Sequence, residues 1–243
     1  MKTPWFTPPA ASAKAILFCF PFSGGSASAF REWTSAAPSS LAVVPVQLPG
    51  REARLMEKPF SDIHALNGAV LEVMRPYLDR PYALFGHSMG ALIIFELARL
   101  IRRKGLPAPQ HIFPSAFRSP EKPNPREDIH HLREKGFIDK LREYGGTPES
   151  VFQHEELLQL IMPMLQADFS VHETYRYYEE EPLDVPISIF AGLNDRVVPE
   201  NHMDGWDKHT RASFKKRAVP GEHFYVGSAR PLLMRGILAD LGL

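Results

Sequence analysis

The sequence predicts an α/β fold in which a mostly parallel sheet is covered by helices on both faces. Short, continuously apolar segments alternate along the chain with segments whose apolar residues recur at helical spacing. Strands that are apolar on both sides are typical of parallel sheets with two buried faces. One stretch, residues 120–180, departs from this alternation and has the pattern of helices only. We therefore predict a core formed by residues 1–119 and 181–243, interrupted by a helical insertion at 120–180.

Six apolar segments are the predicted strands, and three segments of helical spacing are the predicted core helices. The strands are expected at residues 15–20, 41–48, 82–85, 111–117, 185–191 and 213–219. The helices are expected at residues 63–77, 88–104 and from 229 to the end. Glycine and proline mark several of the boundaries, as at Pro49-Gly50 and Gly105.

The helical insertion is expected to cover the carboxyl ends of the strands. It begins with a proline- and charge-rich stretch, and Thr147-Pro148 suits the N-cap and first turn of one of its helices. Insertions at this edge of a parallel sheet often act as lids over a functional site. We therefore predict a lid, with a helical decoration unrelated to the site as the alternative.

Composition excludes several classes of function. The 243 residues carry 28 Lys and Arg against 28 Asp and Glu, so a chain-wide basic field for nucleic acid is excluded. The single cysteine, Cys19, rules out an internal disulfide and a cysteine-based zinc site. No apolar run reaches the roughly 18 residues of a membrane span, and the first residues lack the apolar core of a signal peptide. We therefore expect a cytoplasmic protein without nucleic-acid or membrane partners.

The segment Gly86-His87-Ser88-Met89-Gly90 matches Gly-x-Ser-x-Gly and lies between a predicted strand and a predicted helix. This is the placement of a nucleophile elbow, in which a strained turn exposes the serine and the glycines let neighbouring backbone approach. The dipole of the following helix favours negative charge that develops near the serine. The motif predicts Ser88 as a catalytic nucleophile, with a plain glycine-rich turn as the alternative.

A serine nucleophile needs a base and an acid that orients it, and in this type of fold both follow the serine in the chain. His223 follows the last predicted strand, and Asp195 follows the strand before it. We assign His223 as general base and then acid, and Asp195 as the group that orients its imidazole. Asp204 and Asp207 are weaker alternatives for the acid. The other histidines considered are expected to be packed (His87) or at the surface (His130, His131, His154, His172, His202 and His209).

Backbone N–H groups must bind the oxyanion of a tetrahedral intermediate. The N–H of Met89, directly after the nucleophile, is the expected first donor. The second is expected from the loop after the first strand, where Phe22 and Ser23 are both candidates. A phosphate-binding role for this glycine-rich loop is disfavoured because it has neither Gly-x-Gly-x-x-Gly nor a P-loop lysine. No metal ligand set is predicted.

Several motifs are distributed over nearly the whole chain. They are Phe18–Ser28 (FCFPFSGGSAS), Val46–Glu52 (VQLPGRE), Phe85–Ala91 (FGHSMGA), Glu173–Tyr177 (ETYRY), Pro186–Asp195 (PISIFAGLND) and Gly221–Tyr225 (GEHFY). Together they resemble the type II thioesterases that accompany nonribosomal peptide and polyketide synthases. Pro-Gly-Arg and the Gly-Gly loop are more specific than Gly-x-Ser-x-Gly. Relatives often have Ala at the position of Ser23 and Gly at that of Glu222, and neither difference removes a catalytic side chain.

The resemblance implies an α/β-hydrolase fold with a helical lid. It also implies hydrolysis of acyl thioesters on the phosphopantetheine arm of carrier proteins, which clears stalled or mis-primed synthases. No cofactor is implied for the chain itself, because the phosphopantetheine belongs to the partner carrier protein. The alternatives are an acyl-CoA thioesterase, a carboxylesterase with the same triad, and a non-enzymatic binding protein of the same fold.

Such an enzyme needs an apolar acyl pocket and a surface that meets the carrier protein. The predicted pocket residues are Phe137, Leu160, Met164 and Phe169, with ordinary packing inside the insertion as the alternative for each. Further candidates are Leu141, Phe152, Leu157, Ile161 and Tyr175. Two basic clusters are candidate docking patches, although either could be a solvated face: Arg99, Arg102, Arg103 and Lys104, and Lys208, Arg211, Lys215, Lys216 and Arg217.

Overall fold

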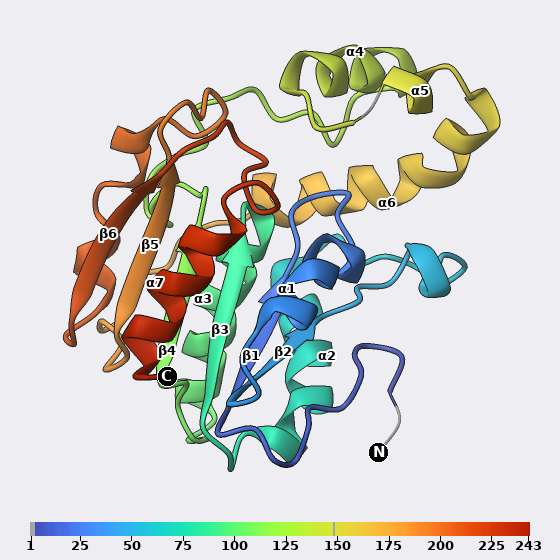
Figure 1. Ribbon diagram of the computed structural model, residues 1–243. Coiled ribbons are helices and arrows are strands. Elements are labelled where there is room, and N and C mark those ends of the chain that lie inside the picture. The colour runs from blue at the N-terminus through green and yellow to red at the C-terminus, as the bar shows by residue number, and fades with distance from the viewer. Residues whose placement is uncertain (1–2, 148) are drawn as a thin grey trace.

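A six-stranded parallel sheet forms the centre of the protein (Figure 1). The computed structural model describes residues 3–147 and 149–243. The strand order is β2-β1-β3-β4-β5-β6. The strands are β1 (Ala15–Phe20), β2 (Leu41–Pro45), β3 (Tyr82–His87), β4 (His111–Ser115), β5 (Ile187–Gly192) and β6 (Phe214–Val219). The predicted α/β class and the parallel arrangement of the sheet are confirmed.

Each face of the sheet has its own apolar core, because successive strand residues point to opposite faces. Ile16 and Phe18 of β1 belong to one core, and Leu17 and Cys19 belong to the other. Burial on both sides explains why β1 is a continuous apolar run. Two longer helices cover the first face, and a short and a long helix cover the second (Figure 1). They are α2 (Ile63–Met74) and α3 (Met89–Arg103), and α1 (Arg31–Ala36) and α7 (Arg230–Leu241).

Three elements end earlier than predicted. Strand β2 ends at Pro45, although the Val46 N–H still donates to the Cys19 carbonyl of β1 at 2.9 Å. The residues that follow are buried by packing, so their apolar character did not indicate a strand. Strand β4 stops at Ser115 because Ala116 has a positive φ of 52°. Helix α2 gives way to a 3-10 turn that contains Pro76.

The helices of the predicted insertion lie over the carboxyl ends of the strands (Figure 1). They are α4 (Glu134–Tyr144), α5 (Glu149–Phe152) and α6 (Glu155–Glu173). Their apolar side chains form a third core, separate from the two cores on the sheet. Pro148, predicted as the first-turn residue after a cap at Thr147, lies outside the described residues. The division of the chain at residues 119 and 181 stays a prediction.

Short 3-10 segments complete the structure at loops and helix ends. They are η1 (Ala27–Phe30), η2 (Glu52–Arg54), η3 (Arg75–Tyr77), η4 (Glu200–Met203) and η5 (Trp206–His209). In the described part of the chain, none of the helices combines the length and the apolar character that crossing a membrane requires.

Candidate active site

Ser88 occupies a sharp turn between β3 and α3. Its backbone has a φ of 54° and a ψ of −120°, which is a strained conformation for a residue with a side chain. The Ser88 N–H donates to the carbonyl of Ser115 at 2.7 Å, which holds the turn against β4. A Cβ on Gly86 would lie 2.0 Å from the Gly90 oxygen, and one on Gly90 would lie 2.2 Å from the Phe20 oxygen. Both glycines are therefore required by close backbone approach, as the motif predicted.

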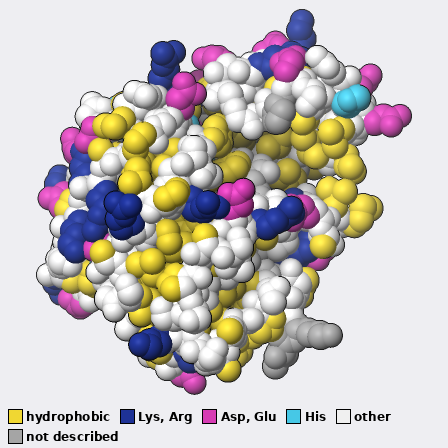
Figure 2. All heavy atoms as spheres, in the orientation of Figure 1, with side chains coloured by type: hydrophobic (Ala, Val, Ile, Leu, Met, Phe, Trp, Pro, Cys, Tyr) yellow, Lys and Arg dark blue, Asp and Glu magenta, His cyan; other side chains and the backbone are white. Residues whose placement is uncertain are grey.

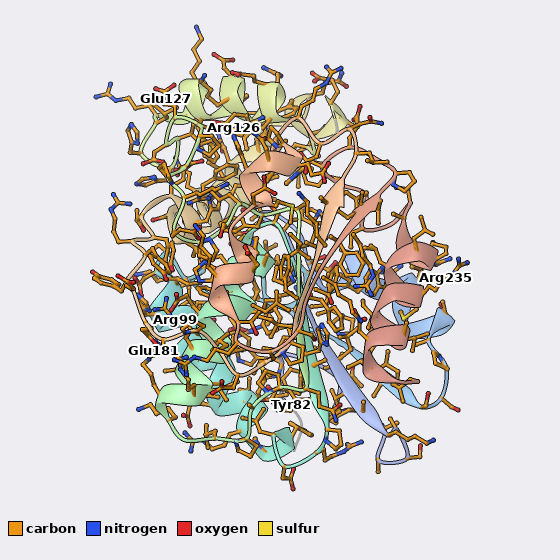
Figure 3. The ribbon with its side chains drawn as sticks, turned by 90° about the vertical axis from the view of Figure 1, so that its left-hand side faces the viewer. Tyr82, Arg99, Arg126, Glu127, Glu181 and Arg235 are labelled. Carbon is orange, nitrogen blue, oxygen red and sulfur yellow. The ribbon has the colours of Figure 1, made fainter. Side chains whose placement is uncertain are left out.

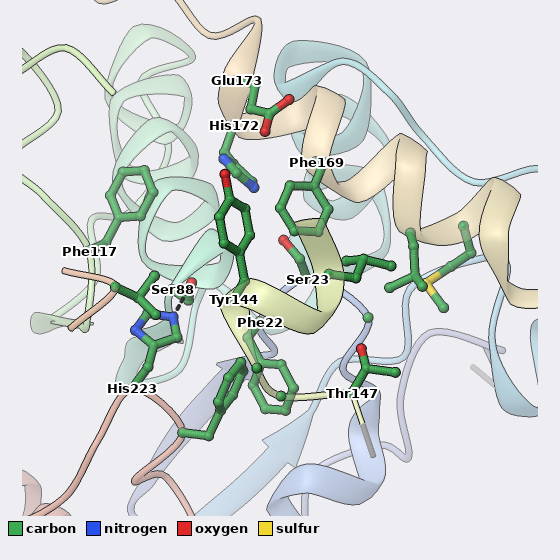
Figure 4. A pocket seen from close by; sticks show the side chains of 18 of the residues that line it. Phe22, Ser23, Ser88, Phe117, Tyr144, Thr147, Phe169, His172, Glu173 and His223 are labelled. Carbon is green, nitrogen blue, oxygen red and sulfur yellow. Dashed lines mark hydrogen bonds between the residues drawn. The ribbon is translucent and has the colours of Figure 1, made fainter. Parts of the chain in front are cut away.

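The structure brings Ser88, His223 and Asp195 into one hydrogen-bonded chain. The Nε2 atom of His223 lies 3.0 Å from Ser88 Oγ (Figure 4). Its Nδ1 atom lies 2.8 Å from Asp195 Oδ2. The other carboxylate oxygen of Asp195 accepts the N–H groups of Val197 and Val198, both at 2.8 Å. Burial raises the pKa of Asp195, but the hydrogen bonds from His223 and the two backbone groups outweigh it and lower that pKa.

The alternatives to these three residues lie elsewhere. Asp204 is exposed and pairs with Lys216, and Asp207 is also exposed, so neither meets an imidazole in the way Asp195 does. Two further serine–histidine contacts are present, Ser115–His87 at 2.9 Å and Ser188–His111 at 2.8 Å. Both of these serines are fully buried and lie outside the cavity that Ser88 lines.

His87 is a packed residue beneath the site, as predicted. Its Nε2–H donates to the carbonyl of His223 at 2.8 Å, and its Nδ1 accepts from Ser115 Oγ at 2.9 Å. Burial, together with the nearby imidazole of His223, lowers the pKa of His87 to about 3. His87 is therefore neutral near pH 7 and supports the backbone at His223.

The buried neutral state of His87 predicts a loss of stability in acid. In the unfolded chain its pKa is near 6.5, above the folded value of about 3, so the unfolded state binds more protons below pH 6.5. The free energy of unfolding should therefore fall as the pH drops from 7 to 5, by about 2 kcal/mol from His87 alone. Burial also lowers the pKa of His111, to about 4, so His111 acts in the same direction.

Urea titrations at pH 7 and pH 5 measure this loss. The variant His87→Gln should be less stable at pH 7 but should lose less further stability at pH 5. His64→Gln, at an exposed position on α2, is the matched control and should keep the wild-type pH dependence. An identical pH dependence in His87→Gln and the wild-type protein would contradict the prediction.

A cavity of about 370 Å³ lies beside Ser88 and His223 and beneath the lid (Figure 4). Phe22 and Ser23 line it from the loop after β1. The predicted pocket residues Met164 and Phe169 line it from α6. Other lid side chains in the lining are mainly apolar: Leu141, Tyr144, Val151, Ile161 and Leu165.

Two of the predicted pocket residues lie outside the lining. Phe137 is fully buried behind Phe169, with ring centroids 5.6 Å apart, and belongs to the core of the lid. Leu160 is 49% exposed, because it lies about 100° around α6 from Ile161, which lines the cavity. The weaker candidates Phe152, Leu157 and Tyr175 are not in the lining either.

Part of the cavity is lined by polar residues that were not predicted to belong to it. His172, predicted at the surface, lines it, and burial and the charge of Arg118 lower its pKa to about 3. Arg118 is buried, with its guanidinium 4.7 Å from the centroid of the Phe117 ring. The helical spacing of Ile161, Met164, Leu165 and Phe169 continues to His172, so periodicity was the signal that could have identified it. No comparable signal marked Arg118.

The three predicted oxyanion donors are backbone groups, and Phe22 and Ser23 line the same cavity as Ser88. Met89 is the first residue of α3, and the first N–H groups of a helix have no acceptor within it. Phe22 and Ser23 belong to a tight turn closed by the Gly25 N–H, which donates to the Phe22 oxygen at 2.8 Å. Within the described residues, no protein acceptor engages the N–H of Phe22 or Ser23. The arrangement can therefore supply donors to an oxyanion.

Acidic side chains partly neutralise the first predicted docking patch. Arg99 is buried and pairs with Glu96 and Glu180, and Arg102 and Arg103 also pair with Glu180. The chain just before β5 runs past α3 and supplies this carboxylate, which spacing along the helix could not reveal. Figure 3 shows Arg99 and Glu181 on this lower part of the molecule, away from the labelled residues near the lid.

The second predicted patch is also largely paired. Lys215 and Arg217 pair with Asp240, which lies on α7 beside β6. The remaining pairs are Lys216 with Glu200 and Asp204, and Arg211 with Glu181. The basic clusters therefore carry less net positive charge than the sequence alone suggested. On the face drawn in Figure 2, Lys and Arg side chains likewise lie next to Asp and Glu side chains at several places. Among residues 3–147 and 149–243, no group of three or more His, Cys, Asp or Glu residues is placed to hold a metal ion.

Comparisons with known proteins point to one family. The family model described as a thioesterase domain matches residues 15–241. The gramicidin S biosynthesis protein GrsT of Aneurinibacillus migulanus is 42% identical over 215 residues, which cover 88% of this chain and 84% of that protein.

Two solved structures extend the likeness to the fold. The RedJ thioesterase from the prodiginine pathway of Streptomyces coelicolor has a TM-score of 0.88 and 36% identity, covering 98% of this chain and 95% of that one. The type II thioesterase BorB from the borrelidin biosynthetic cluster has a TM-score of 0.87 and 34% identity, covering 98% of this chain and 97% of that one.

Proposed function

The chain belongs to the thioesterase family, and from this premise we propose that it hydrolyses acyl thioesters on the phosphopantetheine arm of carrier proteins. In this role it edits nonribosomal peptide or polyketide synthases by removing acyl groups that block them. The observation that carries the proposal is the Ser88–His223–Asp195 chain, which opens on a mainly apolar cavity beneath a lid.

The proposed reaction begins with attack of Ser88 Oγ on the thioester carbonyl. His223 Nε2 takes the hydroxyl proton, and Asp195 stabilises the imidazolium that forms. The N–H of Met89, with that of Phe22 or Ser23, binds the oxyanion of the tetrahedral intermediate. The carbon–sulfur bond then breaks, the leaving thiolate receives the proton from His223, and an acyl-enzyme remains on Ser88.

Water completes the proposed cycle. His223, neutral again, removes a proton from a water molecule as its oxygen attacks the acyl carbonyl. Collapse of the second tetrahedral intermediate breaks the bond to Ser88 Oγ, which recovers its proton from His223. The products are the free acid and the regenerated enzyme, and the phosphopantetheine thiol leaves with the carrier protein.

Features of the cavity and its surroundings support an acyl substrate delivered by a protein. Apolar side chains from α6, including Met164 and Phe169, would contact an aliphatic acyl group. Leu55 lines the cavity, and its neighbour Met56 is 91% exposed, so the proposed carrier protein would have an apolar side chain to contact beside the cavity. The proposal includes a cytoplasmic location with the synthase, which cell fractionation tests.

A panel of acyl donors tests the proposed substrate class. The same acyl group is offered on a carrier protein, on CoA, on a small thiol and on an alcohol, and kcat/KM is compared. We expect the carrier-bound thioester to exceed the CoA thioester by at least about tenfold, since carrier contacts add binding free energy.

The alternatives give different orders of kcat/KM. Equal values on carrier protein and CoA would favour an acyl-CoA thioesterase. Higher values on the oxygen ester than on any thioester would favour a carboxylesterase. Either of these two results would contradict the proposed function.

A further inference from the structure

The loop after β1 is tied to the lid helix α6 through a buried ion pair. Arg51 donates from Nη1 to Asp168 Oδ2 and from Nη2 to Asp168 Oδ1, both at 2.7 Å. Asp168 Oδ2 also accepts the N–H of Gly24 at 2.8 Å, and Arg51 Nη1 also donates to the carbonyl of Gly25 at 2.9 Å. The side chains of Arg51 and Asp168 are only 5% and 3% exposed. The pair therefore fixes one N–H and one carbonyl of the same short loop.

These contacts restrict the part of the loop that carries the proposed oxyanion donors. A peptide group is planar, so a fixed Gly24 N–H also fixes the orientation of the carbonyl of Ser23. The turn is closed from Gly25 to Phe22 by a 2.8 Å backbone hydrogen bond. Gly24 has a φ of 77°, and a Cβ there would lie 2.7 Å from Leu165 of α6. The loop thus has little room to change conformation while α6 keeps its place.

The chemistry of the pair points to positioning rather than to stability. Two charges lose their hydration when buried, and a buried ion pair is often no more stabilising than an apolar pair of similar size. Arginine also provides a planar group that can bind both carboxylate oxygens and a backbone carbonyl together, which lysine cannot. This accounts for the arginine of the Pro-Gly-Arg motif, which the triad leaves without a role.

We propose that Asp168, held by Arg51, is a positioning residue that couples the placement of lid helix α6 to the geometry of the oxyanion donors. The inference rests on the proposed function, because it concerns the same site. With α6 in place, Asp168 holds Gly24, and the N–H groups of Phe22 and Ser23 are held where the oxyanion forms. With the pair broken, the loop has other conformations, and binding of the oxyanion is weakened.

The variants Asp168→Asn and Arg51→Lys test the inference. An asparagine cannot keep all of these contacts, because one of its two acceptor oxygens is replaced by a donor. An NH₂ in place of Oδ1 would face Arg51 Nη2–H, and an NH₂ in place of Oδ2 would face the Gly24 N–H and Arg51 Nη1–H. We expect Asp168→Asn to lower kcat/KM on a small acyl thioester by about 10- to 100-fold. The upper end of this range approaches the effect of removing one oxyanion donor. Arg51→Lys leaves Asp168 charged and still able to accept the Gly24 N–H, so this variant should lose less kcat/KM than Asp168→Asn.

Two inhibitors separate positioning from a merely structural role. An alkyl boronic acid forms a tetrahedral adduct with Ser88, and its affinity should fall in parallel with kcat/KM. The free carboxylic acid product, which has no developing oxyanion, should bind each variant within about twofold of the wild-type value. The matched control is Glu96→Gln, which breaks another buried ion pair, that of Glu96 with Arg99. Both of these side chains are 3% exposed, and both belong to α3 rather than to the loop after β1. It should lower stability and leave both affinities and kcat/KM unchanged.

Retention of kcat/KM and of boronic acid affinity in folded Asp168→Asn would overturn the inference and leave the proposed function standing. Equal losses for the boronic acid and the product acid would overturn it too, because they would indicate a general change of the pocket. If Asp168→Asn does not fold, Arg51→Lys decides by the same two inhibitors. Failure of the proposed function itself has another signature, namely thioester turnover that is absent from the wild-type protein or survives Ser88→Ala.

Discussion

Replacing Ser88 by alanine is expected to lower kcat on acyl thioesters by at least about 10⁴-fold while the protein stays folded. In the proposed reaction no acyl-enzyme can form without Oγ, and the nearest remaining route is direct attack by water in the cavity. The hydrogen bonds of the Ser88 backbone to Ser115 and Ala91 do not involve the hydroxyl, so the turn is retained. Steady-state kinetics at saturating substrate, with circular dichroism to verify folding, measure the effect.

A second measurement identifies the nucleophile directly. A fluorophosphonate probe should label the wild-type protein and fail to label Ser88→Ala. Ser188→Ala is the matched control, because Ser188 also contacts a histidine, at 2.8 Å, but lies outside the cavity. It should keep its labelling and its kcat. Turnover that survives in Ser88→Ala, or labelling lost only in Ser188→Ala, would refute the assignment of the nucleophile.

The strands of the sheet were predictable because a strand buried on both faces consists of consecutive apolar residues. Strand β1 is buried on both faces, so all six of its residues are apolar, and its predicted limits match the structure. Limits that depend on backbone conformation were harder to predict. Nothing in the residue type of Ala116 indicates the positive φ that ends β4. Val46 and Leu48 are as apolar as strand residues because they are buried in the same core without being in a strand.

Ser88, His223 and Asp195 could be selected together because chain order and the ends of the strands constrain their positions. Loops after parallel strands meet at one edge of the sheet, so residues far apart in sequence were expected to come together. The residues that line the cavity were harder to predict from the sequence. An apolar residue on a lid helix can contact substrate or neighbouring helices, and only the rotation of the helix decides between Ile161 and Leu160.

Contacts between distant polar residues left the weakest signal in the sequence. Arg51 and Asp168 are 117 positions apart, and neither belongs to a local charge pattern. The basic residues of α3 show the opposite case, a clear local pattern whose charge is changed by a residue far away in the chain. Arg99, Arg102 and Arg103 formed a clear cluster in the sequence, but all three pair with Glu180, also distant in the chain, which reduces the net positive charge of the cluster. Charge balance therefore had to be read from tertiary structure.

Replacing Asp195 by asparagine is expected to lower kcat by about 10³- to 10⁴-fold, the second largest effect we predict. The cause lies in the hydrogen bonds of the carboxylate. The N–H groups of Val197 and Val198 bind Oδ1, so in the variant they should hold the amide oxygen and direct the amide NH₂ toward His223 Nδ1. A donor facing Nδ1 makes that nitrogen an acceptor and leaves the proton on Nε2. The Nε2 atom, which faces Ser88, then has no free electron pair to receive the hydroxyl proton.

This loss should arise in kcat with little change in stability or in product affinity, because shape and packing are conserved between aspartate and asparagine. Asp204→Asn supplies the control, since Asp204 follows the same strand but is exposed and pairs with Lys216. It should keep kcat within about twofold of the wild-type value, as for most surface substitutions. A fall of less than tenfold in Asp195→Asn, or a larger fall in Asp204→Asn, would show that the imidazole is oriented by another group. The proton route from Ser88 would then have to be assigned anew.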